Sequence, residues 1–446
     1  MWTEKSISTN LKKSVILLLF LQSVLVLYAN SFFLLGFNVK FFSQNIRYTA
    51  QKNKYLDISS LKNDIYINKN NRKFNFTVIP NGVEAEPTLT LINIPSNDSV
   101  KRILVKLTPY KWTTPFGFQE REINLYWNQP ENHRNFLTAQ YYKIEDVYGL
   151  VEVHTNSKLT NINKCGGNVT HYINYENAIV PSENPKYDVV VVLPPCYDVP
   201  YFQHFLDNGA PQLSLMHFAT NFDPKKTVIC LRNWNTPMIP FLLDRYGFMK
   251  VVSGENDISA KTLIIPRVSP MVHPILTKDF DDRLHLNHSM PADLVILVSR
   301  SHGDGSKSSR MIENQNELED VLKEEYKDKF IVFHPTSAKP AQAVSLFERA
   351  WMIIGSHGGG LYHAFWAREG TNVVEIMPET EDGRYHGQRD FKAGTGIAHR
   401  CFHTNSRNLQ QYFFRYVVYC ESSNYKINAT DFIEWLKAAL AYFRNQ

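Results

Sequence analysis

The sequence predicts an α/β protein with two Rossmann-like halves that face a cleft, after an N-terminal transmembrane helix and a stem. Three observations support this prediction. Short apolar strands alternate with helices in two series, over residues 188–265 and 294–377, which is typical of parallel sheets with helices on both faces. A glycine-rich loop follows one strand of the second series. A long uncharged stretch lies near the N-terminus.

Composition and charge narrow the class of protein. The chain of 446 residues is long enough for two core-forming domains and a tail, and its hydrophobic content of 43% argues against disorder. The formal net charge of +5 comes from residues 1–73, which hold 11 basic and 3 acidic side chains. The remainder holds 37 basic and 40 acidic residues, so nucleic-acid binding is not expected.

The N-terminal region is predicted to anchor the protein in a membrane. Val15–Phe37 contains no charged residue and is long enough for a tilted transmembrane helix. A cleaved signal peptide and a buried core helix are the alternatives, but no A-x-A-like cleavage site follows. The sequence therefore predicts a cytoplasmic tail at residues 1–14, the anchor at 15–37 and a polar stem at 38–73.

Basic residues flank the anchor on both sides, so the distribution of positive charge does not indicate its orientation. Glycosylation sequons indicate the orientation instead. Five glycosylation sequons lie after the anchor, at Asn75, Asn97, Asn168, Asn287 and Asn428. Their spread favours a type II layout with a lumenal body. All five cysteines lie in this body without metal-type spacing, so no zinc site is expected. They allow at most two disulfides, of which Cys401–Cys420 is the first expected.

The first α/β half is predicted within residues 74–270. Three β-type patches, at Thr88–Ile94, Arg102–Leu107 and Val147–His154, are expected to cap the larger fold. The alternating series then predicts strands Val189–Leu193, Thr227–Leu231 and Thr262–Ile265, and helices Tyr201–Phe218 and Pro237–Tyr246. Gly209–Pro211 is expected to break the first of these helices.

The second half is predicted at residues 271–446, with a linker at Pro266–Pro291 between the two series. Its strands are expected at Leu294–Ser299, Phe330–His334, Trp351–Ile354 and Val373–Met377. Its helices are expected at Arg310–Tyr326, Pro340–Ala350, Leu361–Ala367 and Asp431–Phe443. Two such halves would place ligands at the carboxyl ends of their parallel strands.

Gly358, Gly359 and Gly360 connect a predicted strand to the next helix. Backbone N–H groups and the helix dipole attract anions at such a position, and glycines let a diphosphate approach the backbone closely. The loop matches neither the dinucleotide fingerprint nor the P-loop pattern. It is predicted to be a phosphate cradle, and a plain strand-to-helix turn is the structural alternative.

Three segments carry a resemblance to a known family. They are YFQHFLDNGAPQL from residue 201, SRSHGDGSKSSRMIEN from residue 299, and AVSLFERAWMIIGSHGGGLYHAFWAREGTNVVEIMP from residue 343. They resemble glycosyltransferase family 61, which includes plant-type β-1,2-xylosyltransferases and O-linked N-acetylglucosaminyltransferases of the secretory pathway. The resemblance covers residues 188–404. Where the family usually has His-Gly-Ala-Gly-Leu-Thr-Asn, this chain has His-Gly-Gly-Gly-Leu-Tyr-His at residues 357–363.

The resemblance implies a GT-B-like fold behind a type II anchor in the Golgi or ER membrane. It also implies an inverting enzyme that moves a sugar, xylose or N-acetylglucosamine, from a UDP-sugar to a hydroxyl of a glycan or glycoprotein. The UDP-sugar is then the donor substrate, and neither a cofactor nor Mn²⁺ is expected.

Transfer from a nucleotide sugar needs stabilisation of the departing diphosphate. Arg300, at a strand end, and Arg310, at the start of the next predicted helix, are expected to bind the diphosphate in place of a metal. His357 directly precedes the glycines and is expected to donate to a phosphate or ribose oxygen.

Binding of the ribose hydroxyls requires a carboxylate, and removal of the acceptor proton requires a base. Glu375 lies inside an apolar strand and is expected to bind the ribose hydroxyls, with an ion pair to Arg368 or Arg384 as the alternative. His204 and Asp207 lie three residues apart on one predicted helix face. They are the expected catalytic pair, with His204 as the base for the acceptor hydroxyl.

Two alternatives remain open at the level of sequence. The Asp279-Phe280-Asp281 triplet matches the Asp-x-Asp pattern of a metal-dependent transferase. A membrane-anchored glycan-binding protein of the same fold, without activity, is the second alternative. Dependence on Mn²⁺ would indicate the first, and an absence of nucleotide binding would indicate the second.

Overall fold

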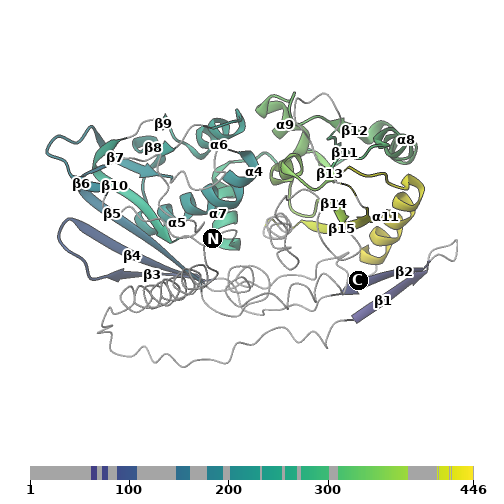
Figure 1. The fold of residues 1–446 in the computed structure, drawn as a ribbon, viewed down its shortest axis with the longest axis horizontal. Coiled ribbons are helices and arrows are strands. Elements are labelled where there is room, and N and C mark those ends of the chain that lie inside the picture. Colours follow the sequence, from purple (N-terminus) through teal and green to yellow (C-terminus); the bar gives the residue numbers. More distant parts are fainter. Residues whose placement is uncertain are drawn as a thin grey trace, which may run out of the picture. The chain divides into compact units, whose positions relative to one another are not determined.

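The strands of the two predicted halves form two sheets in a computed structural model of the protein (Figure 1). The structure describes residues 62–67, 73–78, 88–107, 147–160, 178–193, 201–231, 234–253, 257–268, 273–300, 310–379, 409, 411–420, 422 and 424–444. The predicted anchor Val15–Phe37 lies outside these residues. No helix within them is long and apolar enough to cross a membrane. Cys401 also lies outside, so its pairing with Cys420 stays a prediction.

The first sheet has eight strands in the order β3-β4-β5-β10-β7-β8-β9, with β6 paired to β5. The antiparallel part contains β3 (Leu89–Ile94), β4 (Val100–Leu107), β5 (Val147–Leu159) and β6 (Ile179–Pro181). The parallel part contains β7 (Tyr187–Val192), β8 (Val228–Leu231), β9 (Lys250–Ser253) and β10 (Ile258–Val268). The three predicted β-type patches are confirmed as β3, β4 and β5, and they extend the parallel strands in one sheet, because β5 pairs with β10 from end to end of that strand.

The segment after β7 forms one continuous helix with a widened turn. It consists of α4 (Phe202–His204), the π-helix η2 (Phe205–Gly209) and α5 (Ala210–Thr220). The expected break at Gly209–Pro211 is wrong, because the π turn of η2 leads directly into α5, and Pro211 falls in the first turn of α5, where proline is tolerated. The Ala210 N–H instead reaches back five residues to the Phe205 carbonyl.

The predicted linker Pro266–Pro291 is also wrong, because it contains the end of β10 and the helix α7 (Pro274–Arg283). Proline is tolerated in the first turn of α7. Phe280 of α7 is fully buried and stacks on Tyr246 of α6 (Met238–Tyr246). Helix α7 thus packs with the helices of the first sheet, although the predicted boundary between residues 270 and 271 precedes it.

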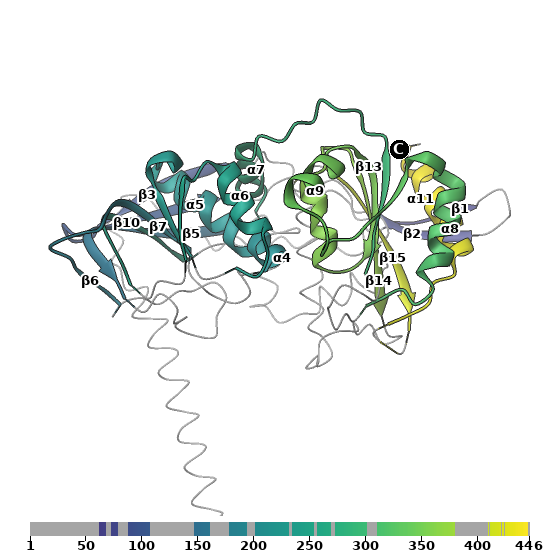
Figure 2. The same ribbon diagram turned by 90° about the horizontal axis from the view of Figure 1, so that it is seen from above.

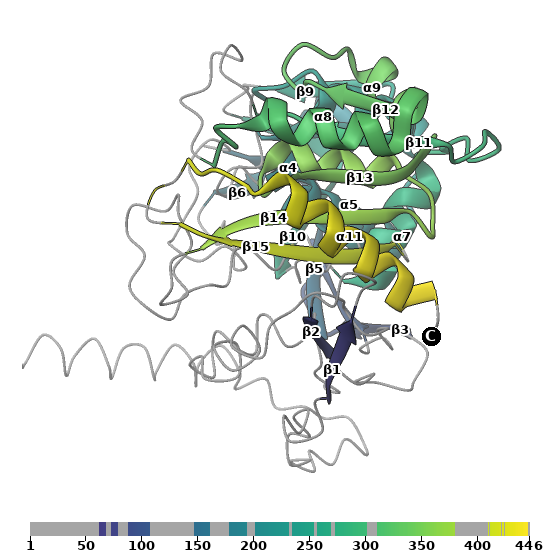
Figure 3. The same cartoon turned by 90° about the vertical axis from the view of Figure 1, so that its right-hand side faces the viewer.

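The second sheet has five parallel strands in the order β12-β11-β13-β14-β15. The strands are β11 (Leu294–Val298), β12 (Phe330–Phe333), β13 (Ala350–Ser356), β14 (Asn372–Glu379) and β15 (Tyr412–Tyr419). Helix α9 (Pro340–Phe347) covers one face, and α8 (Gln315–Tyr326) and α11 (Ala429–Arg444) cover the other (Figures 2 and 3). Strand β15 has no counterpart among the predicted strands.

Two local predictions in this half and one in the predicted stem need correction. Helix α8 begins at Gln315 and not at Arg310, whose positive φ of 74° is not helical. The helix after the glycines is a 3₁₀ helix, η5 (Gly359–Trp366). The predicted stem contains β1 (Lys62–Ile67), which pairs with β2 (Lys73–Val78) as an antiparallel hairpin. Both sheets lie within one compact unit, residues 53–446.

Candidate functional site

The crevice between β11 and β13 brings the predicted phosphate-binding residues together. In chain order the strands of the second sheet lie 2-1-3-4-5, and ligands of such sheets bind outside the carboxyl ends of the neighbouring first and third strands. Arg300 follows β11, and His357 and Gly358 follow β13. The Arg300 Nη1 donates to the His357 carbonyl at 3.2 Å. This bond links the carboxyl ends of β11 and β13 beside the glycine loop.

The three glycines allow other groups to approach the loop closely. A Cβ at Gly358, which has φ 152°, would lie 1.7 Å from Arg300 Nη1. A Cβ at Gly359 would lie 2.9 Å from Gln203 Oε1, and one at Gly360 would lie 2.8 Å from Pro335 Cγ. Gln203 of α4 therefore lies beside the loop. The prediction missed this residue, although it directly precedes the predicted base His204.

Arg310 lies near His357, and its backbone carbonyl is hydrogen-bonded to a neighbouring side chain. Its carbonyl accepts a hydrogen bond from Ser356 Oγ at 2.8 Å, and Tyr425 Oη donates to the same Ser356 Oγ at 2.8 Å. The charge of Arg310 is close enough to contribute to a lowered pKa of His357, although burial of the imidazole is the larger cause. The two predicted diphosphate-binding arginines thus both lie close to His357.

His357 and Glu375 are joined to a third residue that the sequence did not indicate. His357 Nδ1 lies 2.5 Å from Glu375 Oε1. Arg415 of β15 holds the other carboxylate oxygen, with Nε at 2.9 Å and Nη2 at 2.8 Å from Oε2. Glu375 and Arg415 are register partners on adjacent strands. An arginine inside the apolar strand YFFRYVVY was the signal that could have identified Arg415.

Among the described residues, the arginine that pairs with Glu375 is therefore Arg415 and not the proposed Arg368. Arg368 donates to the Glu348 carbonyl at 2.9 Å, and Arg384 lies outside the described residues. Complete burial would raise the pKa of Glu375, but the charge of Arg415 and the contact with His357 outweigh burial and lower it. Glu375 is thus a buried, ionised carboxylate.

The two predicted catalytic residues lie on successive helical elements, and their catalytic role stays a prediction. Asp207 lies in the π-helix η2 and is buried, and its Oδ2 accepts a hydrogen bond from Tyr362 Oη at 2.9 Å. His204 ends α4, and its ring lies against Tyr201. A π-helical turn places residues three apart differently from an α-helical one. The structure thus joins Asp207 to Tyr362 of η5, two residues after the glycine loop.

The Tyr362–Asp207 bond gives a direct prediction. Replacing Tyr362 by phenylalanine removes one donor from the buried Asp207 side chain and should lower the free energy of unfolding by about 1–3 kcal/mol, the typical cost of leaving a buried acceptor without its partner. Denaturant unfolding of the wild type and the variant measures this difference. A change below about 0.5 kcal/mol would show that the bond contributes little.

The Asp-x-Asp triplet lies on helix α7. Arg283 donates from Nε to Asp279 Oδ1 at 3.0 Å, and burial raises the pKa of Asp281 to about 7. Residues two apart on an α-helix point in different directions, so the two carboxylates do not converge. Among the described residues, no group of three or more His, Cys, Asp or Glu side chains is arranged to hold a metal.

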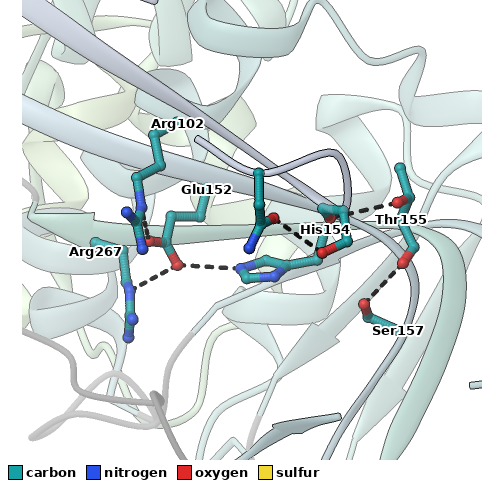
Figure 4. A network of polar contacts seen from close by, with 8 residues as sticks. Arg102, Glu152, His154, Thr155, Ser157 and Arg267 are labelled. Atoms are coloured by element: carbon teal, nitrogen blue, oxygen red, sulfur yellow. Dashed lines mark hydrogen bonds and ion pairs between the residues drawn. The ribbon is translucent and has the colours of Figure 1, made fainter. Parts of the chain in front are cut away.

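A second buried charge cluster lies in the first sheet (Figure 4). Glu152 of β5 accepts from Arg102 Nε at 2.8 Å, from Arg267 Nε at 2.9 Å and from His154 Nε2 at 3.1 Å. Burial would raise the pKa of Glu152, but the bond from His154 and the charges of Arg267 and Arg102 lower it to about 2. Glu152 is therefore ionised at neutral pH.

Comparison with known proteins gives one result for the region that contains this crevice. Residues 202–374 match the model of a protein family described as Glycosyltransferase 61. The matched region includes Arg300, Arg310, His357 and the three glycines, and it ends one residue before Glu375. No curated protein matches the chain.

Proposed function

Because residues 202–374 are a glycosyltransferase family 61 domain, we propose that this protein is an inverting glycosyltransferase with a UDP-sugar donor. The proposed transfer is of xylose or N-acetylglucosamine to a hydroxyl of a glycan or glycoprotein. The observation that carries the proposal is the crevice between β11 and β13, where Arg300, His357 and the glycine loop meet. Such crevices are the usual nucleotide sites of open parallel sheets.

The charge of the crevice suits a diphosphate. Arg300, Arg310 and Arg415 carry three positive charges against the one negative charge of Glu375. Arg415 is paired with Glu375, and in this proposal Arg300 and Arg310 bind the diphosphate. Arginine stabilises the developing charge of a phosphate leaving group without a metal, and we therefore propose that no Mn²⁺ or other cofactor is needed.

The proposed base comes from the helix after β7. His204 is half-buried on α4, one residue from Gln203 at the glycine loop. A single displacement with one base inverts the anomeric centre, because the acceptor hydroxyl attacks the face opposite the UDP group. In this proposal His204 takes the acceptor proton, and Asp207, bonded to Tyr362, holds the helix against the loop.

The proposed location is the Golgi or ER membrane, with Val15–Phe37 as a type II anchor and the catalytic body in the lumen. The sequon residues Asn97, Asn287 and Asn428 are exposed, which leaves room for attached glycans. Glycosidase treatment of the protein isolated from a secretory expression host tests this location. A body without glycans at all three positions would argue against it.

Titration of the full-length protein in detergent with UDP in the presence of chelator tests the proposed donor site. The wild type should bind UDP, and Arg310→Ala should weaken binding at least tenfold, since a charged hydrogen bond contributes about 1.5–3 kcal/mol. Arg349→Ala is the matched control, because Arg349 pairs with Asp293 at the opposite, amino-terminal ends of the same strands.

Other outcomes of this titration identify the alternatives. Binding that appears only with Mn²⁺ would favour a metal-dependent transferase that uses Asp279 and Asp281. An absence of UDP binding in both conditions would favour a glycan-binding protein without activity. If UDP binds, assays with UDP-xylose and UDP-N-acetylglucosamine identify the donor, and the anomeric configuration of the product tests inversion.

A further inference from the structure

His357, Glu375 and Arg415 form a row across three adjacent strands of the second sheet. His357 follows β13, Glu375 lies on β14 and Arg415 on β15, and these strands are neighbours in the sheet. Glu375 is directly opposite Arg415 in the strand register. All three side chains are buried, with exposed fractions of 8% for His357, 0% for Glu375 and 3% for Arg415.

The charge of Glu375 depends on Arg415. A carboxylate without water at this depth is strongly destabilising unless a charged and hydrogen-bonded partner compensates it. Arg415 supplies that partner with two N–H groups, from Nε and Nη2, on one carboxylate oxygen. The other oxygen, Oε1, contacts His357 Nδ1.

An ionised carboxylate decides which imidazole nitrogen carries the proton. It has no hydrogen to donate, so it can only accept. Its contact with His357 Nδ1 is therefore a hydrogen bond donated by Nδ1–H, as in other carboxylate–histidine pairs that hold a ring in one tautomer. The ring orientation is fixed by the same bond.

We infer that Arg415 and Glu375 are positioning residues of the donor site, where Arg415 keeps Glu375 ionised and Glu375 holds His357 with its proton on Nδ1. The inference rests on the proposed function for the identity of the ligand. It assigns Glu375 to the imidazole and not to the ribose, because both oxygens of the carboxylate are engaged by protein groups.

This arrangement changes the role of His357. Burial favours the neutral imidazole, and a neutral ring with its proton on Nδ1 has an acceptor at Nε2. In that state His357 can accept at Nε2 but cannot donate from it, so it does not donate to the phosphates of the UDP-sugar. The diphosphate is left to the arginines and the backbone of the glycine loop.

Nitrogen NMR of the ligand-free protein with ¹⁵N-labelled histidine tests the tautomer directly. The His357 signals are assigned by their loss in His357→Gln. In the wild type the proton should be on Nδ1. In the double variant Arg415→Met with Glu375→Gln, which removes both charges and leaves no uncompensated ion, the signals should move towards a mixture of tautomers. A wild-type proton on Nε2, or an unchanged tautomer in the double variant, would overturn the inference.

Titration with UDP tests the consequence for binding. The double variant should bind UDP about tenfold more weakly than the wild type while its melting temperature stays close to that of the wild type. The control is Arg349→Met with Asp293→Asn, which removes an exposed ion pair at the amino ends of the same sheet and should leave UDP affinity unchanged.

The two measurements separate the inference from the proposed function. If the wild type binds no UDP but the tautomer changes in the double variant, the proposed function fails and the positioning of His357 stands. If the folded double variant binds UDP as tightly as the wild type, the row has only a structural role and the inference is overturned. Arg415→Lys, which keeps the charge but loses the guanidinium fork, should show an intermediate affinity.

Discussion

Replacing Gly358 by alanine should weaken UDP binding by about 100-fold, for two physical reasons that add. Gly358 has φ 152° and ψ 178°, a backbone region that is essentially restricted to glycine and that costs about 1–3 kcal/mol for other residues. The new Cβ would also lie 1.7 Å from Arg300 Nη1, so the guanidinium must leave the His357 carbonyl. Titration with UDP measures the loss, since 100-fold corresponds to about 2.7 kcal/mol.

Two control variants separate the contributions of strain and of the arginine. Gly370 also has a positive φ, 77°, but a Cβ there would meet only Tyr412 Cε2 at 4.0 Å. Gly370→Ala should therefore lower stability by about 1 kcal/mol without changing UDP affinity. Arg300→Ala should weaken UDP binding without the backbone strain. If Gly358→Ala binds UDP like the wild type, then neither the loop nor Arg300 belongs to the donor site.

Replacing Glu152 by glutamine should lower the free energy of unfolding by about 3–5 kcal/mol, because it leaves buried Arg267 without its carboxylate partner. Denaturant unfolding measures the loss. Asp257→Asn is the matched control, because Asp257, directly before β10, forms an ion pair with Lys158 of β5 at the surface, with side chains 44% and 41% exposed. That pair should contribute less than about 1 kcal/mol.

The same carboxylate should make stability depend on pH in acid. The folded pKa of Glu152, about 2, lies below its ordinary value of 4.5. The unfolded chain therefore binds the proton first, and the stabilisation is present above pH 4.5 and is lost as the pH falls towards 2. Unfolding curves between these pH values should show a smaller decrease for Glu152→Gln than for the wild type. Equal decreases would assign the acid sensitivity to other carboxylates.

Much of the second half was predictable because its strands are short apolar segments between helices. The strand Leu294–Ser299 corresponds to β11 and the strand Val373–Met377 to β14, each within a few residues. Apolar runs of this kind indicate strands that helices cover on both faces. The predicted α/β class with parallel sheets is confirmed, whereas the GT-B arrangement of the two halves stays a prediction.

The wrong predictions concern segments whose local sequence pattern is compatible with two different structures. The Gly-Ala-Pro sequence at residues 209–211 indicated a break, but a proline in the first turn of a helix is tolerated, and a π turn accommodates the change. The segment Pro266–Pro291 looked like a linker because prolines mark both ends, yet Pro274 begins helix α7. Proline alone does not distinguish a helix start from a loop.

The sequence by itself determined the α/β class, most of the parallel strands and the positions of Arg300, His357 and Gly358 at strand ends. Strand ends and glycine loops are local features that adjacent residues encode. Only the tertiary structure decided the partners of the buried charges. Glu375 and Arg415 lie 40 residues apart in the chain, and Asp207 and Tyr362 lie 155 apart. Burial determines whether a carboxylate needs such a partner, and strand register and helix packing determine which residue supplies it.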